Sequence, residues 1–213
     1  MHSGDIVLGY AGNCQYQESM SNPEDNCQVD NMKRVKLRAT AWLKNHEKNI
    51  RDSAYDIALI EFVEDIQGEF TTICLPQQNF KLPSFGALAG FGMTSEAPRT
   101  FKPQLRYITG DLKWSGEGFI TLHTDGFAKN DATQKYGLKA TTGGKALGGD
   151  SGGPVVGWHE DNQKAVQFGI ESASFENYER ICDVRKHVDW ICELTGVCGF
   201  SHSSNSYSKT VRL

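Results

Sequence analysis

The chain has 213 residues, which is enough for one compact unit or for two small barrels with a hydrophobic core. Its formal net charge of −4 provides no basic surface of the kind that nucleic acid requires, so nucleic acid is excluded as a partner. No stretch reaches the roughly 18 consecutive apolar residues of a transmembrane helix, so no membrane span is predicted.

The first part of the chain is predicted to form short strands separated by polar loops. Residues 5–10 and 35–43 are the first two predicted strands, the second because apolar and charged side chains alternate along it. Between them, Cys14 and Cys27 bracket a polar loop that contains a proline. A Cys14–Cys27 disulfide is the preferred pairing, although six cysteines allow fifteen connectivities.

An aspartate, Asp56, stands at the start of the next predicted strand, residues 56–62. A polar loop over residues 44–55 precedes it, and an apolar run follows it. A carboxylate at the edge of a buried strand needs a partner, because an unpaired buried charge is costly. Asp56 is therefore either a cap at the loop edge or an acid that holds another side chain, and its immediate neighbours do not decide between the two.

A connector over residues 67–85 leads to a second unit that starts near Ala87. The strands predicted in this unit are residues 105–108, 119–123, 155–158 and 166–170, the last two as a hairpin, and residues 138–142 lead toward a glycine-rich turn. One helix is predicted over residues 184–194, because its apolar residues recur on one face. Residues 201–213 are Ser-rich and aperiodic, which is typical of disorder. Short strands separated by turns, with a single late helix, predict an all-β barrel architecture.

The stretch with the clearest chemistry is Gly148-Gly149-Asp150-Ser151-Gly152-Gly153-Pro154, followed by two valines. Glycines on both sides of the serine permit turn conformations and leave room for a substrate carbonyl. Ser151 would lie exposed on this turn, and the N–H groups of Gly149 and Ser151 could converge on a developing oxyanion. A surface turn with an incidental serine is the alternative for any Gly-Ser-Gly triplet, but the longer run favours a nucleophile.

Four further markers stand in the order found in the chymotrypsin/trypsin family of serine proteases, which the sequence resembles over about residues 5–198. These markers are Asp56-Ile57-Ala58-Leu59-Ile60, Ile73-Cys74-Leu75-Pro76, Gly90-Phe91-Gly92 and Val188-Asp189-Trp190-Ile191. The ending at residues 191–198 resembles a divergent, trypsin-like branch found in nematodes. The resemblance implies a double Greek-key β-barrel with a C-terminal helix: an incomplete first barrel over residues 1–75, a second barrel and helix over 76–198, and a tail over 199–213.

The resemblance also implies a serine endopeptidase that works through a Ser-His-Asp triad and an acyl-enzyme. Ser151 would be the nucleophile, and Asp56 would orient the histidine. A polypeptide substrate or a protease inhibitor is the expected partner of a monomer, with no cofactor and no metal. Six cysteines fit the secreted location that is usual in the family, although residues 1–20 lack the features of a signal peptide.

The catalytic histidine is not securely identified. In the family this base precedes the aspartate, and only His2 and His46 precede Asp56. His46 lies in a charged loop, and His2 could serve only with a shortened loop before the first strand. We therefore expect the base to lie upstream of Met1, so that the 213-residue chain hydrolyses little or nothing. A catalytically inactive homologue that acts as a binding module is the alternative.

Active members of the family also need a terminal ammonium. A cleavage frees this terminus, which inserts beside the aspartate that precedes the serine and completes the oxyanion hole. In this sequence that aspartate is Asp150, and Met1 is not such a terminus. The activation site is therefore expected upstream of Met1 as well.

The residues that correspond to the family's specificity pocket are unusual. Lys145 falls at the pocket base, where an acid would bind Lys or Arg, and it would instead repel them and could attract an acidic side chain. Glu179 falls where the family usually has glycine, and a Lys145–Glu179 pair is expected to fill or close the pocket. The alternative is that both side chains point to solvent. Ser172 and Ser174 are small enough to let a substrate backbone pair with this wall strand.

The serine turn also matches the Gly-x-Ser-x-Gly elbow of α/β-hydrolases. That fold needs alternating strands and helices, with its acid and histidine after the serine. Only one helix is predicted after Ser151, so this interpretation is disfavoured.

Overall fold

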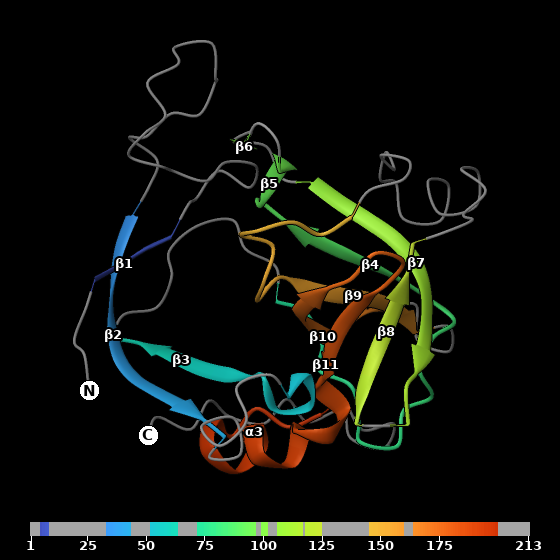
Figure 1. Cartoon of the computed structure of the whole chain (residues 1–213). Helices are drawn as coiled ribbons and strands as arrows, with labels where there is room; N and C mark the ends of the chain where they lie inside the picture. The colour runs from blue at the N-terminus through green and yellow to red at the C-terminus, as the bar shows by residue number, and fades with distance from the viewer. Residues whose placement is uncertain are drawn as a thin grey trace.

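The computed structural model describes residues 5–8, 33–43, 52–63, 72–96, 99–101, 106–116, 118–124, 145–159 and 164–199 (Figure 1). Its strands are β1 (Asp5–Leu8), β2 (Lys33–Trp42), β3 (Ala58–Phe62), β4 (Phe85–Gly90), β5 (Met93–Glu96), β6 (Arg99–Phe101), β7 (Arg106–Trp114), β8 (Phe119–His123), β9 (Pro154–His159), β10 (Lys164–Ser174) and β11 (Glu179–Asp183). Its helical segments are the 3-10 turns η2 (Ser53–Tyr55) and η3 (Val184–Lys186) and the α-helix α3 (Val188–Thr195).

The first unit is an antiparallel sheet in the order β1-β2-β3. The predicted strands in this part of the chain are therefore confirmed, with one difference. The third strand begins at Ala58 rather than at Asp56, because Asp56 ends the η2 turn that precedes it. Asp56 consequently lies at the junction of a turn and a strand, where its side chain is only half-buried.

The second unit is a closed barrel in the order β10-β11-β8-β7-β4-β9, which lies beside the first sheet in Figure 1. Pairing of Ala87 with Val156 and of Leu88 with Val155 closes it. The barrel interior holds the buried side chains of Leu88, Leu112, Ile120, Leu122, Ala146, Val155 and Ile181. The predicted hairpin is β9–β10, and β7 runs further than residues 105–108. β5 and β6 form a small separate sheet that was not predicted.

The C-terminal helix packs against both units. The predicted helix over residues 184–194 is divided: η3 is followed by α3, which begins after His187. α3 ends at Gly196, whose positive φ of 72° suits glycine, and a Cys192–Cys198 disulfide ties off this end. One buried cluster joins the two units, and its members are Ile57, Cys182, Val184, Val188 and Ile191. This cluster anchors the residue that directly follows Asp56.

The structure confirms the predicted all-β, trypsin-like architecture with one late helix. The division into residues 1–75, 76–198 and 199–213 stays a prediction. The loop with Cys14 and Cys27, the segment 138–142 and the tail from 201 lie outside the described residues. Across the described ranges, Cys74 and Cys182 are free thiols, and no helix is long and apolar enough to span a membrane.

Candidate active site

The serine turn joins residues 145–150 to β9. The N–H of Asp150 donates to Leu147 O at 3.0 Å, and the N–H of Gly153 donates to Asp150 O at 2.9 Å. Gly149 and Gly152 have φ values of 97° and 84°, which a side chain would strain. The turn therefore needs glycine on both sides of Ser151, and it leaves Ser151 exposed.

Two backbone N–H groups of this turn donate no hydrogen bond to any described residue. The N–H groups of Asp150, Gly152 and Gly153 all donate to backbone carbonyls. Within the part of the chain that the structure describes, those of Gly149 and Ser151 have no acceptor. An oxyanion hole requires donors that are fixed in place but not already used, and these two N–H groups meet that condition.

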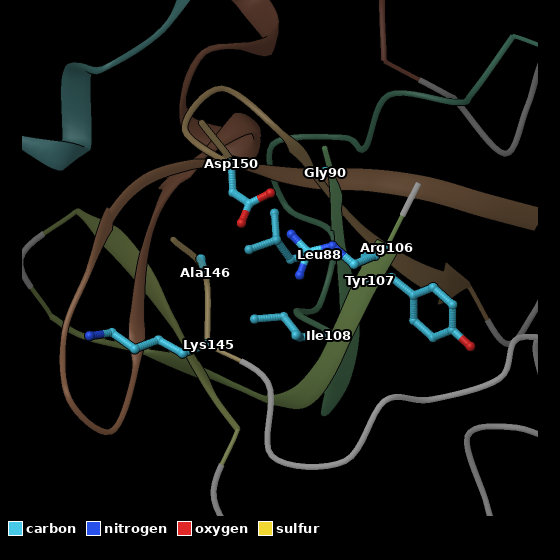
Figure 2. Close-up of a pocket in the computed structure, with 8 residues that line it drawn as sticks. All are labelled: Leu88, Gly90, Arg106, Tyr107, Ile108, Lys145, Ala146 and Asp150. Carbon is cyan, nitrogen blue, oxygen red and sulfur yellow. The ribbon is translucent and has the colours of Figure 1, made fainter. Parts of the chain in front are cut away.

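The Asp150 carboxylate turns inward, away from Ser151, and is 8% exposed. Its Oδ1 accepts from Gly92 N at 2.7 Å, and its Oδ2 accepts from Leu147 N at 3.0 Å. A Cβ at Gly90 or Gly92 would collide with this carboxylate, so the predicted Gly-aromatic-Gly segment is glycine-rich because an acid packs on it. Figure 2 shows Asp150 at the edge of a cavity of about 50 Å³.

A contact from β10 holds Asp56 at the end of η2, and the C-terminal segment binds the preceding turn at Ala54. The Ser172 hydroxyl lies 2.7 Å from Asp56 Oδ2 and 3.1 Å from Ser53 Oγ, and its single proton goes to the nearer, charged acceptor. His187 Nε2 donates to Ala54 O at 2.7 Å. Ser172, which the sequence suggested only as a partner for a substrate backbone, therefore positions an acid.

The structure describes three of the chain's histidines. His187 is buried, and burial lowers the pKa of its imidazole, with opposing contributions from the Ala54 carbonyl and Asp183. His123 Nε2 lies 3.0 Å from Thr121 Oγ1. His159 ends β9. His2 and His46, which precede Asp56, lie outside the described residues.

Two carboxylates are buried beside the serine turn. Glu171 is 2% and Glu179 is 1% exposed, and the Oε2 atom of each makes no hydrogen bond to any residue that the structure describes. Burial raises the pKa of Glu171 to about 8, and the charges of Glu179, Asp150 and Asp56 add to this. Sequence reasoning missed Glu171, although an acid inside the apolar wall strand was a visible signal.

The expected Lys145–Glu179 salt bridge is not formed. Among the described residues no ion pair joins Lys145 and Glu179. Lys145 is exposed, and its side chain extends away from the cavity (Figure 2). Glu179 Oε1 instead accepts from Ala146 N at 2.9 Å. Burial raises the pKa of Glu179, whereas the Ala146 N–H, the Ser174 hydroxyl and the charge of Lys145 lower it. The Ser174 hydroxyl has this effect on the pKa of Glu179 although its Oγ makes no hydrogen bond to a described residue.

Comparison with known proteins gives one clear result. The family model described as Trypsin matches residues 3–191, which is most of the chain. No curated protein matches the chain. The match covers the first sheet, the barrel and the serine turn, as well as Asp56. The chain therefore belongs to the trypsin family of serine proteases.

Proposed function

We propose that the chain is a secreted serine endopeptidase in which Ser151 is the nucleophile and Asp56 orients the base. One observation carries this proposal: adjacent residues of β10 hold both groups. The backbone of Glu171 accepts from Gly152 N at 2.8 Å and donates to Gly153 O at 2.9 Å, next to Ser151. The following residue, Ser172, binds Asp56. The acid and the nucleophile turn are thus fixed against the same strand, although they lie far apart in sequence.

The reaction is peptide hydrolysis in two acyl-transfer steps. A histidine removes the proton of the Ser151 hydroxyl as its oxygen attacks the scissile carbonyl, and then gives that proton to the leaving amine. The N–H groups of Gly149 and Ser151 bind the oxyanion in each tetrahedral intermediate. Water, activated by the same histidine, then releases the acyl group and regenerates Ser151. Asp56 stabilises the imidazolium throughout.

The substrate is proposed to lie along β10. Pairing of β10 with β9 ends at Ile170, opposite Pro154, so residues 172–174 have no strand on that side within the described ranges. A polypeptide in extended form could add its backbone to this edge, past Ser172 and Ser174. Lys145 and Glu179 are the proposed charged determinants of side-chain selection, Lys145 from the surface and Glu179 from within. A proteinaceous inhibitor would use the same edge, and the enzyme is proposed to act as a monomer.

The catalytic base is still to be assigned, so the experiment supplies imidazole as a base from solution. Hydrolysis of a peptide library is measured for the 213-residue chain and for Ser151→Ala, each with and without imidazole, which can act as the base in place of a histidine side chain. Little hydrolysis is expected without imidazole, and hydrolysis that depends on Ser151 is expected with it. His2→Ala and His46→Ala test whether any imidazole-independent rate uses a histidine of this chain.

The competing function is a binding module on the same fold, without catalysis. Equal rates for the wild type and Ser151→Ala under all conditions would favour it over the protease. The transcript offers an independent discriminator: an upstream exon that encodes a signal peptide and an Ala-His-Cys-like segment supports the protease.

A further inference from the structure

The cavity beside Asp150 contains an internal cation. Arg106 begins β7, and Figure 2 shows its guanidinium pointing into the cavity beside Leu88, whereas Tyr107 points away. Arg106 Nη2 donates to Gly92 O at 2.5 Å and to Met93 O at 2.7 Å. No ion pair joins Arg106 and Asp150 in the described residues, so the guanidinium acts on the backbone of the neighbouring segment.

The Gly92 carbonyl, which accepts from Arg106, belongs to the peptide unit that is hydrogen-bonded to the serine turn. The Gly92 carbonyl and the Met93 N–H are the two polar groups of one peptide unit. That Met93 N–H donates to Gly148 O at 2.9 Å. The Gly148 carbonyl in turn shares its peptide unit with the Gly149 N–H, which has no acceptor in the described part of the chain. A continuous chain of two hydrogen bonds and two peptide units thus runs from Arg106 to Gly149.

We infer that Arg106 is a positioning residue for the oxyanion hole, acting on the Gly149 N–H through the Gly92–Met93 and Gly148–Gly149 peptide units. The guanidinium pulls electron density toward the Gly92 oxygen and so makes the Met93 N–H a stronger donor. The stronger bond to Gly148 O then fixes the Gly149 peptide and makes its N–H more positive, since hydrogen bonds in a chain polarise one another. This inference rests on the proposed function only for the use of that N–H by a substrate.

A second contact supports the same role. The Gly92 N–H donates to Asp150 Oδ1 at 2.7 Å, so the segment that Arg106 binds also holds the residue after Gly149. Asp150 and Gly148 flank Gly149, and both are bound to residues 92–93. Residues 92–93 therefore bond to the chain on both sides of Gly149, and the carbonyls of residues 92–93 are in turn bound by Arg106.

The decisive experiment reads the Gly148–Gly149 peptide directly. The sequence contains three Gly–Gly pairs: Gly143–Gly144, Gly148–Gly149 and Gly152–Gly153. In protein labelled with ¹³C′,¹⁵N-glycine, an HNCO spectrum therefore shows these three peptides alone. Arg106→Gln should move the Gly148 ¹³C′ and Gly149 amide proton upfield, while the Gly152–Gly153 peak stays in place and reports an intact fold. Arg106→Lys, which keeps the cation, should give a smaller shift.

Lys113→Gln is the matched control, because it removes a positive charge from an exposed position of the same strand. It should leave all three peaks unmoved. A Gly148–Gly149 peak that is unchanged in folded Arg106→Gln, or that moves equally in Lys113→Gln, overturns the inference.

Binding of a peptide boronic acid tests the functional consequence, because its tetrahedral adduct with Ser151 places a charged oxygen in the hole. Loss of a whole oxyanion donor costs 10²–10³-fold, so the indirect loss in Arg106→Gln should weaken binding by about tenfold. Lys113→Gln should bind as the wild type does, and Arg106→Lys should lie between. Unchanged affinity in Arg106→Gln contradicts the inference. If Ser151→Ala binds as tightly as the wild type, the proposed function fails, and the peak shifts still decide whether the relay exists.

Discussion

The hydroxyl of Ser172 donates a 2.7 Å hydrogen bond to Asp56 Oδ2, across 116 positions of the chain. This bond joins the end of η2, which belongs to the first unit, to the barrel strand β10. The neighbouring residue Glu171 bonds through its backbone to both glycines that follow Ser151. Because one strand sets both positions, small changes in β10 should affect the acid and the nucleophile together.

Ser172→Ala should lower the acylation rate of Ser151 about three- to tenfold, because Asp56 loses a donor that holds its carboxylate in place. The cost in stability should be about 1 kcal/mol, as for a typical hydrogen bond. The matched control is Ser115→Ala, whose hydroxyl also makes a 2.7 Å bond, to Phe119 O. It should lose similar stability and no reactivity, and equal loss of reactivity in both variants would refute the role of Ser172.

Glu171→Gln should change how stability depends on pH. The pKa of Glu171 is raised from 4.5 to about 8, so between these values the native state keeps a proton that the unfolded state has released. The contribution of this group to the free energy of unfolding is therefore fully present below pH 4.5 and is lost as the pH rises toward 8. The loss should be on the order of 5 kcal/mol, at about 1.4 kcal/mol for each pKa unit.

The neutral Gln side chain removes this dependence, so the variant should gain stability relative to the wild type as the pH rises from 4.5 to 8. Denaturant unfolding across that range measures the difference. Glu176 is an exposed acid between β10 and β11. The free energy of unfolding of Glu176→Gln should depend on pH as that of the wild type does. A Glu171→Gln curve that also runs parallel would show that Glu171 titrates normally.

Gly92→Ala should disrupt the serine turn, because its Cβ would collide with the Asp150 carboxylate. Displacing Asp150 moves the Gly149 peptide, so acylation of Ser151 should fall by about 10²-fold, as when an oxyanion donor is lost. Gly116→Ala is the control: it has open space but a φ of 82°, so it should cost about 1 kcal/mol of stability without affecting reactivity. Retention of full reactivity by Gly92→Ala would contradict the assigned role of Asp150.

The double variant Cys192→Ser/Cys198→Ser should destabilise the protein by about 2 kcal/mol, since the disulfide closes a short loop at the end of α3. The helix packs on Ile57, beside Asp56, so the first unit should share in this loss. Thermal unfolding with and without a reducing agent measures the effect. The difference from the wild type should vanish under reducing conditions, and a difference that persists there would assign the effect to lost packing instead.

Local sequence patterns were sufficient for most of the fold. Alternation predicted β2, two short runs across a polar turn predicted the β9–β10 hairpin, and the glycines around Ser151 predicted the turn, because these features depend on neighbours in the chain. They did not predict that Asp56 caps a 3-10 turn, or that His187 interrupts the C-terminal helix. Both depend on the packing of η2 against β11 and the helix.

The site was harder to predict because its contacts join distant strands. Ser172 was named as a substrate contact, and its bond to Asp56 depends on how the two units pack. Glu179 was paired with Lys145 by charge alone, yet its carboxylate is met by the Ala146 N–H, one residue from that lysine. A backbone donor next to an expected partner leaves no sequence signal. The chain from Arg106 to Gly149 is equally invisible in sequence, since every link after the guanidinium is backbone.

Ser151 is proposed to be a nucleophile beside a formed oxyanion hole. The most direct measurement is acylation by a peptide active ester in the presence of imidazole, with the modified residue located by peptide mass mapping. We expect an acyl group on Ser151 in the wild type and none on the corresponding peptide of Ser151→Ala. Acylation that spares Ser151, or that falls on other residues at the same rate in both proteins, would contradict it.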